Sequence, residues 1–356
     1  MAVHRAKVEK EDCLSTGSTL INLACSGYPD YGLTKGRYFW MSGDSTSGKT
    51  FLCLTIFAEA ANNRYWDNYD LVFDDVEGGA LMDMEKFFGA KMAARLQPPA
   101  VADGLPVYSA TAEDFYFGLD DRLSLVEAGK GKPFLYLLDS MDALSSIYEA
   151  AKFDEKKKAR RGGAKAKGDY GDGKAKINSS WIRTIVRRLR DTKSTLIILS
   201  QTRDNMDGGM FDPKSITAGG RALKFYATWQ LQSSVGAKIK KTVNGKDRIV
   251  GVQSRIQIQK NRLTGRARTT EVPIYYSYGI DDVGSMVDFM TEEKAWKMTG
   301  GKIAAPDLGL DVSLSRDKLI KHIEEKRLQF DLQNEVYDAW KAIEEKCELP
   351  REGRYE

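Results

Sequence analysis

The feature that most constrains the fold is the glycine-bounded segment 43–50, which reads Gly-Asp-Ser-Thr-Ser-Gly-Lys-Thr. It fits the pattern G-x-x-x-x-G-K-[ST], in which glycines let backbone N–H groups approach a phosphate chain and the following helix adds its positive end. The segment lies between an aromatic, apolar run at 37–43 and an apolar helical stretch that starts at Phe51. This context predicts a strand, a phosphate-binding loop and a helix rather than a chance match on a glycine turn.

The residues of this loop are candidates for binding ATP and Mg²⁺. Lys49 is predicted to reach the β- and γ-phosphates, and the Thr50 hydroxyl is predicted to ligate the metal ion. The candidate nucleotide-binding residues of the loop are Gly43, Asp44, Ser45, Thr46, Ser47, Gly48, Lys49 and Thr50.

The rest of the chain favours an α/β fold. Buried strands are predicted at 71–75, 134–140 and 195–201, and helix-compatible segments at 111–128 and 180–191. Strands that alternate with helices indicate a mainly parallel sheet covered on both faces. After residue 220 the segments alternate in polarity, and Asn244-Gly245 marks a hairpin turn between two of them, which predicts an antiparallel extension of the sheet. Helical spacing near the C-terminus predicts a small helical unit.

Polar side chains follow the predicted strands, where ligands of open α/β sheets bind. Asp139 closes the apolar run FLYLLD, so we expect it to act as a Walker B aspartate that binds Mg²⁺ through a water. Glu77 follows another strand and could polarise the attacking water, with Asp74 and Asp75 as rivals for this role. Gln201 ends a further strand, where an amide could sense the γ-phosphate.

The segment 152–178 is strongly basic, with ten Lys or Arg against four Asp or Glu, which gives 10 − 4 = +6. Each cation near a phosphate releases a counterion and adds affinity for nucleic acid that does not depend on sequence. Tyr170 offers a face on which a base could stack. A solvated charge run without a ligand and a localisation signal are the alternatives. The candidate DNA-binding cations are Lys156, Lys157, Lys158, Arg160, Arg161, Lys165 and Lys167.

Taken together, the motifs resemble the RecA family of homologous-recombination ATPases. The segments that carry this resemblance, in the family's order and approximate spacing, are STGSTLINLACSG, GDSTSGKT, LLDSMDAL, LSQTRDNMDGGMFDPKSITAGGRALKFYA and IQKNRLTG. GGRALKFYA is the most specific of them. The resemblance implies a RecA-like P-loop NTPase core at 14–300, with a short arm at 1–13 before it and the small helical unit at 301–356 after it.

The resemblance also implies roles for single residues. Lys49, Thr50 and Asp139 are similar to the family's nucleotide and Mg²⁺ residues. Glu77 is similar to its catalytic base, and Gln201 to the switch glutamine that couples ATP to a DNA-binding loop.

In this family ATP lies between neighbouring subunits of a helical filament. Lys260 and Arg262 resemble the pair of cations that the neighbouring subunit inserts, and arginine at the second position keeps the charge. Lys224, a further candidate nucleotide-binding residue, and Phe225 are implied to lie at the same interface.

Two mobile loops of the family hold single-stranded DNA. One follows the Walker B strand and the other follows the switch glutamine, so 152–178 and 202–219 occupy their positions. In the second loop Arg203 could meet a phosphate, while Met210 and Phe211 could wedge between bases or simply pack the loop onto the body.

The sequence departs from the family pattern in two places that concern function. Family members usually carry an N-terminal helix that packs on the adjacent subunit, whereas only about a dozen residues precede STGS here, so we expect that contact to be shortened, replaced or absent. Where the family often has an aromatic residue against the adenine, this chain is expected to use Met84, whose thioether could also support the base.

The implied function is a DNA-dependent ATPase and recombinase that assembles on single-stranded DNA, pairs it with a homologous duplex and exchanges strands in recombination and repair. A hexameric, helicase-like motor on the same fold and an ATP-switched binding protein for single-stranded DNA are the alternatives. A small-molecule phosphotransferase does not explain the basic segment. The sequence has no window near the ~20 apolar residues of a membrane helix and no signal-peptide core, so we expect a bacterial cytoplasmic protein, including that of a phage-infected cell, with no membrane partner.

Overall fold

The computed structural model describes residues 8–161, 173–204, 215–217 and 221–351. Its helices are α1 Thr19–Ser26, α2 Lys49–Asn62, α3 Met84–Phe88, α4 Ala90–Arg95, α5 Ala112–Glu127, α6 Ile147–Arg161, α7 Gly173–Thr192, α8 Arg221–Tyr226, α9 Asp282–Glu292, α10 Arg316–Lys326 and α11 Gln329–Lys346, with short 3-10 helices at Lys10–Asp12, Arg64–Trp66 and Pro306–Leu308. Its strands are β1 Cys13–Leu14, β2 Leu33–Thr34, β3 Tyr38–Gly43, β4 Asp70–Asp75, β5 Leu96–Gln97, β6 Ala100–Ala102, β7 Leu105–Val107, β8 Phe134–Asp139, β9 Thr195–Asp204, β10 Ser215–Thr217, β11 Trp229–Val243, β12 Lys246–Asn261, β13 Thr269–Tyr275, β14 Gly279–Ile280, β15 Lys297–Thr299, β16 Lys302–Ala304 and β17 Leu314–Ser315.

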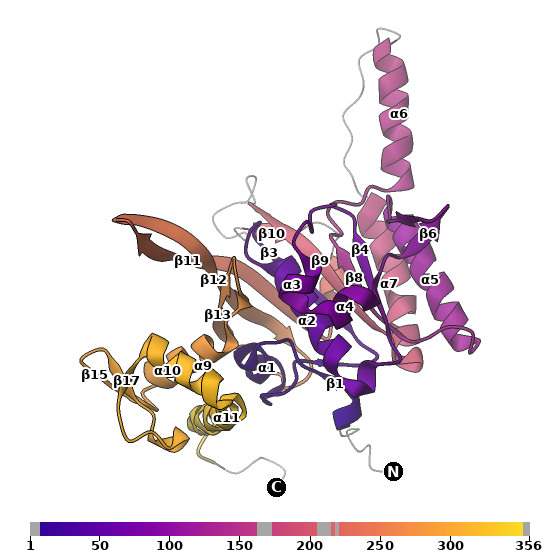
Figure 1. The fold of residues 1–356 in the computed structure, drawn as a ribbon. Coiled ribbons are helices and arrows are strands. Elements are labelled where there is room, and N and C mark those ends of the chain that lie inside the picture. The colour runs from indigo at the N-terminus through magenta and orange to yellow at the C-terminus, as the bar shows by residue number, and fades with distance from the viewer. Residues whose placement is uncertain (1–7, 162–172, 205–214, 218–220, 352–356) are drawn as a thin grey trace, which may run out of the picture.

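The main sheet has the strand order β14-β13-β12-β11-β3-β9-β8-β4-β5, with β10 paired to β9 (Figure 1). From β11 to β5 neighbouring strands of this order run parallel. β12, β13 and β14 continue it with antiparallel pairs. The predicted α/β class, with a mainly parallel sheet and an antiparallel extension, is therefore confirmed.

Both faces of the parallel part of the sheet are buried, as expected for parallel strands. Along β3 the side chains alternate: Phe39 and Met41 pack with α1, α2, α3 and α4, whereas Tyr38 and Trp40 pack with α5, α7 and α8. β3 and β8 are buried along their whole length because each face of the sheet has its own layer of helices there. Packing on both faces fixes the position of β3 in the sheet. It therefore also fixes the position of the residues at the end of this strand.

Four candidate residues meet at one edge of the sheet because the strands that carry them are aligned there, although β9 itself continues past Gln201 to Asp204. Gly43 at the end of β3 lies opposite Gln201 of β9, and Asp75 at the end of β4 lies opposite Asp139 of β8. β8 and β9 are themselves neighbours in the sheet. The carboxyl edge therefore collects residues that lie far apart in the sequence.

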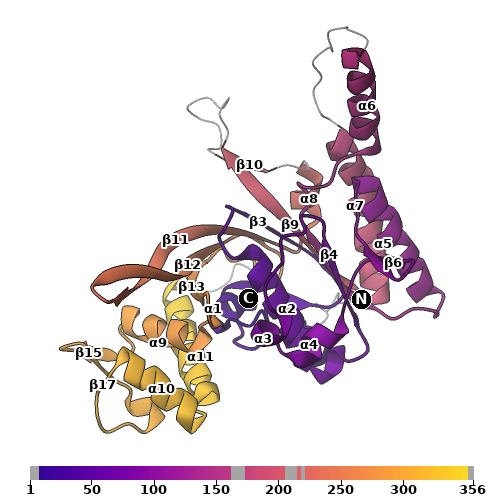
Figure 2. The same ribbon diagram turned by 45° about the horizontal axis from the view of Figure 1, so that its top comes forward.

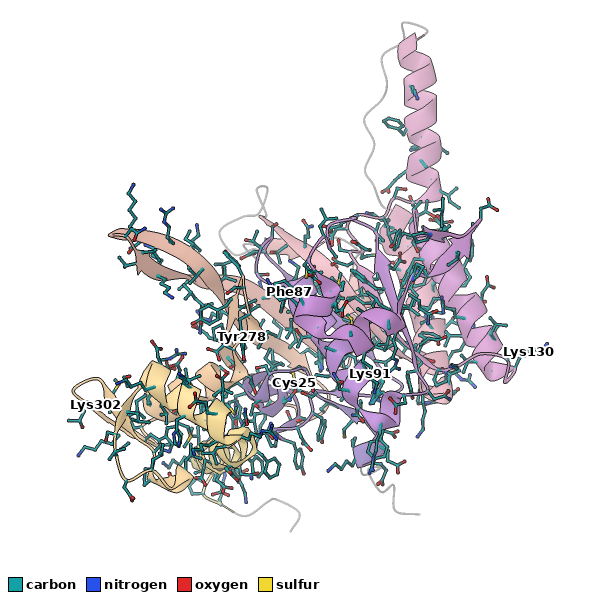
Figure 3. The ribbon with its side chains drawn as sticks, in the orientation of Figure 1. Cys25, Phe87, Lys91, Lys130, Tyr278 and Lys302 are labelled. Carbon is teal, nitrogen blue, oxygen red and sulfur yellow. The ribbon has the colours of Figure 1, made fainter. Side chains whose placement is uncertain are left out.

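A third apolar cluster lies at the C-terminal end of the chain. It combines Leu20 and Leu23 of α1 with side chains of α9, α10 and α11 and with Trp296 and Ile303. The sheet β15-β16-β17 is part of this region, so it holds strands as well as the expected helices; Lys302 of β16 marks it in Figure 3. The division of the chain into 1–13, 14–300 and 301–356 stays a prediction.

The first expected DNA loop, 152–178, is helical at both ends, and the expectation of a loop is wrong there. α6 runs on to Arg161 and projects from the body, and α7 begins at Gly173 (Figure 1 and Figure 2). A capping box starts α6: the Glu149 N–H donates to Ser146 Oγ at 3.1 Å, and the Ser146 N–H donates to Glu149 Oε2 at 3.0 Å. The Ala, Glu, Lys and Arg residues that follow have high helix propensity, which explains the continued helix.

The second expected loop, 202–219, also contains regular structure. β9 continues to Asp204 and pairs antiparallel with β10, so that Arg203 lies opposite Ile216. The β-branched residues of β10 suit a strand. In the part of the chain that the structure describes, no helix is long and apolar enough to cross a membrane.

Candidate active site

The glycine-rich loop between β3 and α2 is held by neighbouring strands. A Cβ atom at Gly43 would lie 2.1 Å from the carbonyl oxygen of Ser233, so only glycine fits this approach of β3 to β11. Ser233 Oγ also lies 2.7 Å from Ser47 Oγ, and Ser254 Oγ of β12 donates to the Ser47 carbonyl oxygen at 2.6 Å. Gly48 has a φ of 88°, which glycine adopts without strain. These contacts give the loop a defined shape.

Lys49 is buried inside this loop. Its Nζ donates to the carbonyl oxygens of Gly43 at 2.9 Å and Asp44 at 2.7 Å. Burial lowers the pKa of Lys49, and the negative charges of Asp139 and Asp44 act in the opposite direction. The ammonium can therefore exchange a carbonyl partner for a phosphate oxygen without a large movement.

Thr50 and Asp139 form an oxygen pair beside Lys49. Thr50 Oγ1 donates to Asp139 Oδ2 at 2.6 Å, and Asp139 is only 8% exposed. Burial raises the pKa of Asp139 to about 6, with smaller contributions from the charges of Glu77 and Asp75, although the Thr50 hydrogen bond opposes the shift. A hydroxyl and a buried carboxylate in this environment fit Mg²⁺, which prefers oxygen ligands and relieves such a charge.

We expect Asp139→Asn to stabilise the nucleotide-free protein in a pH-dependent way. The folded pKa of about 6 lies above the ordinary aspartate value of 3.8, so the ionised carboxyl is disfavoured in the fold and stability is lost as the pH rises through this window. The neutral amide removes this cost, so the free energy of unfolding should rise by about 1 to 3 kcal/mol at about pH 7.5 and by clearly less at about pH 5. Urea unfolding at both pH values measures this. An equal gain in the free energy of unfolding at both pH values would contradict the burial of an ionised Asp139. Glu85→Gln serves as the control, because Glu85 is an exposed carboxylate on α3.

Glu77 is joined to two strand ends. Ser140 Oγ and Gln201 Nε2 both donate to Glu77 Oε1, the latter at 3.0 Å, and the Glu77 N–H donates to the Asp139 carbonyl oxygen at 3.3 Å. The carboxylate is thus fixed between the end of β8 and Gln201 of β9.

The rival carboxylates have other partners. Asp74 is buried and accepts hydrogen bonds from Ser109 N, Ser109 Oγ and Tyr136 OH, and burial raises its pKa. Asp75 accepts from the backbone N–H groups of Gly79 and Ala80, both at 3.2 Å, and so holds the turn after β4. Glu77 is the carboxylate of the three that lines the cavity described next.

A cavity of about 390 Å³ lies over the glycine-rich loop. Of the predicted residues, it is lined by Ser45, Thr46, Gly48, Lys49, Thr50, Glu77, Asp139 and Gln201. The lining residues that the sequence did not indicate are Phe51, Met82, Ser140, Val252, Ile274 and Tyr276. One part of the lining carries charged and hydrogen-bonding groups such as Lys49 and Glu77, which suit phosphates. The other part is apolar and aromatic, with Ile274 and Tyr276, which suits a base.

Gln201 is held at its backbone as well as at its side chain. The Gln201 N–H donates to Asp142 Oδ2 at 2.8 Å. The next residue, Thr202, donates through Oγ1 to Asp44 Oδ1 of the glycine-rich loop at 2.7 Å. The glycine-rich loop and Glu77 are thus both joined to β9 by side-chain hydrogen bonds.

Lys260 and Arg262 lie apart from this cavity, at the C-terminal end of α8. Lys260 Nζ donates to the carbonyl oxygens of Lys224 and Phe225, and Arg262 Nη2 donates to that of Phe225 at 2.8 Å. Both cations lie over the Phe225 ring, which is 63% exposed. Burial and the charge of Arg262 lower the pKa of Lys260 to about 8, and the Nζ of Lys224 lies over Trp40. Within the described ranges neither Lys260 nor Arg262 pairs with a carboxylate.

The predicted DNA-binding residues are described only in part. Lys157 is exposed on α6. Lys156, Lys158, Arg160 and Arg161 belong to α6 and Arg203 to β9, but their side chains are not described. Lys165, Lys167, Met210 and Phe211 lie outside the described residues.

Known proteins are similar to this chain over most of its length. Residues 159–281 match the family model of the RecA N-terminal domain. The chain is 28% identical over 308 residues to Protein RecA of Streptococcus pyogenes serotype M49 (strain NZ131), across 83% of this chain and 70% of that protein. It is 28% identical over 300 residues to Protein RecA of Streptococcus gordonii (strain Challis), across 82% of this chain and 67% of that protein. These matches support membership of the RecA family. The resemblance seen in the motifs is thereby confirmed.

The residue expected against the adenine, Met84, stays without support from the cavity. Met84 begins α3 and packs against the core, and it is not among the residues that line the cavity. Met82 lines the cavity instead, together with Tyr276, which is 59% exposed just after β13. Because Met84 and Met82 differ by two positions on an irregular segment, spacing from Glu77 could not separate them. Tyr276 had no signal in the sequence, since it lies in the alternating part of the chain.

Proposed function

We propose that this RecA family member is a DNA-dependent ATPase that assembles on single-stranded DNA with ATP and Mg²⁺. In that assembly it pairs the strand with a homologous duplex and promotes strand exchange in recombination and repair.

The observation that carries this proposal is the hydrogen bond between Gln201 Nε2 and Glu77 Oε1. Glu77 lines the cavity over the glycine-rich loop, and Gln201 continues directly into the segment 202–219. A nucleotide that changes the position of Glu77 must therefore change the partners of Gln201. The differential contact couples the state of the nucleotide to the second DNA loop.

Each group at the cavity has a distinct task in hydrolysis. Lys49 and the backbone N–H groups of the loop bind the β- and γ-phosphates, which neutralises their charge. Glu77, fixed by Ser140 and Gln201, orients and polarises the water that attacks the γ-phosphorus. Thr50 would ligate Mg²⁺ and Asp139 would hold it through a water, and the ion would supply charge neutralisation at the phosphates.

The Lys260 and Arg262 pair supports assembly between subunits. Two cations that lie away from the cavity of their own chain, beside an exposed Phe225, can serve a phosphate chain that another copy presents. Self-association into a helical filament would then complete each site with the neighbour's cations.

Hydrolysis of ATP with and without single-stranded DNA, combined with negative-stain imaging, tests the proposal. We expect strong stimulation by DNA and helical filaments, and a weaker response when Lys156, Lys157 and Lys158 are changed to Gln, because fewer phosphate contacts remain. Hydrolysis that ignores DNA, or closed rings in place of filaments, would refute the recombinase and favour a motor. DNA binding that depends on ATP without hydrolysis would favour a switch protein.

A further inference from the structure

The hairpin of β11 and β12 extends well beyond the main sheet (Figure 1 and Figure 2). β3 pairs with β11 only up to Ser233, and β13 pairs with β12 only from Gly251 onward. Residues 237–250, called the ribbon tip below, therefore form a two-stranded ribbon that joins no further strand in the described structure. At its base the Tyr276 N–H donates to the Val250 carbonyl oxygen at 3.0 Å. Its side chains are exposed apart from the half-buried Ile239 and Val250.

The ribbon tip is strongly basic. It carries five cations and one carboxylate, which gives 5 − 1 = +4; the cations are Lys238, Lys240, Lys241, Lys246 and Arg248. The carboxylate, Asp247, lies 3.9 Å from Lys240 Nζ and accepts a hydrogen bond from Thr242. In the described part of the chain the other four cations pair with no carboxylate. Most of the charge is therefore available to an external anion.

The register places like charges directly opposite one another. Lys241 lies across from Arg248, an arrangement that disfavours the hairpin when nothing lies over it. Lys246 lies two residues from Arg248 and therefore on the same face, whereas Lys238 and Lys240 alternate to the opposite face. The ribbon tip presents cations on both faces. A flat anionic surface could contact only one face, but a groove with phosphates along both walls can contact both.

We propose that the ribbon tip binds duplex DNA by entering a groove and contacting the phosphates on either side. A two-stranded ribbon fits the major groove of B-form DNA, whereas the major groove of an RNA duplex is too narrow and deep. Residues 237–250 contain no aromatic side chain on which an unpaired base could stack, so a duplex suits them better than a single strand. The binding does not depend on base sequence. This inference rests on the proposed function for its biological setting, and it assigns the duplex a site outside the segments 152–178 and 202–219.

Binding of a labelled duplex of about 30 base pairs at several salt concentrations tests the proposal. We expect Lys241→Thr with Arg248→Thr to lower the slope of log K against log salt by about 2, and the affinity near physiological salt by roughly tenfold or more. Threonine keeps β propensity, and removal of a like-charge pair should not lower the thermal midpoint. The single variant Lys246→Thr should lower the slope by about 1.

The control removes the same charge from an exposed loop after α5, with Lys130→Thr and Lys132→Thr; Lys130 is labelled in Figure 3. An unchanged slope in the ribbon variants, a loss equal to that of the control, or equal weakening toward an RNA duplex would overturn the proposal. Loss of self-association with unchanged duplex binding would also overturn it, since the tip would then contact another copy.

Hydrolysis of ATP stimulated by single-stranded DNA should stay near the wild-type rate in the ribbon variants, because the tip lies outside the cavity and the two loops. If the wild type shows no such stimulation but the ribbon variants lose duplex binding, the ribbon inference stands and the proposed function fails. The two ideas are therefore tested separately.

Discussion

Replacing Glu77 by glutamine is expected to lower the rate of ATP hydrolysis by about two to four orders of magnitude while nucleotide binding stays near that of the wild type. Glutamine keeps the shape of the side chain and can still accept from Ser140 and Gln201 through its amide oxygen. It cannot take a proton or polarise water as a carboxylate does. The loss should therefore appear in kcat, measured by phosphate release, with the Kd for ATP measured separately.

Two matched variants show whether the effect belongs to Glu77. Asp75→Asn removes a charge from the end of the neighbouring strand, but Asp75 holds the backbone N–H groups of Gly79 and Ala80, so its loss should reduce stability more than kcat. Glu85→Gln changes an exposed carboxylate on α3 and should have little effect on either. A collapse of kcat in Asp75→Asn with a retained rate in Glu77→Gln would reverse the assignment.

The residues on the side of the glycine-rich loop could be predicted from sequence because they lie where apolar runs end, and for Gln201 the apolar run ends before β9 does. In a parallel sheet the carboxyl ends of the strands lie at the same edge, whatever sequence connects the strands. Asp139 and Gln201 could therefore be placed at the same edge as Gly43 without knowledge of any loop. The packing of the β3 side chains on two helix layers follows from the same apolar runs. Local pattern was sufficient for this part of the fold.

The opposite wall of the cavity could not be predicted in this way. Ile274 and Tyr276 come from β13 and the turn after it, and their approach depends on the register of β11, β12 and β13. A one-residue slip in that register would turn different side chains toward the loop, and alternation alone does not set it. The start of α6 differs from this case, since Ser146 and Glu149 form a capping box that the sequence already contained.

The double variant Lys260→Ala with Arg262→Ala is expected to leave ATP binding to monomers nearly intact and to reduce DNA-stimulated hydrolysis by roughly three orders of magnitude or more. Neither residue lines the cavity of its own chain, so monomeric binding does not need them. Hydrolysis in an assembly needs both cations if they neutralise the phosphates bound by a neighbouring copy. Equal loss of binding and hydrolysis would place the pair within a single chain. Lys130→Ala with Lys132→Ala controls for the loss of two exposed cations.

A mixing experiment separates an action across the interface from an indirect structural effect. In a mixture of equal amounts of the Glu77→Gln protein and the Lys260→Ala, Arg262→Ala protein, some interfaces join an intact Glu77 of one copy to intact cations of the next. Random assembly makes roughly a quarter of the interfaces complete in this way, so hydrolysis should recover toward that fraction of the wild-type rate although each variant alone is inactive. If both groups act within one chain, every site in the mixture lacks one of them and no recovery occurs.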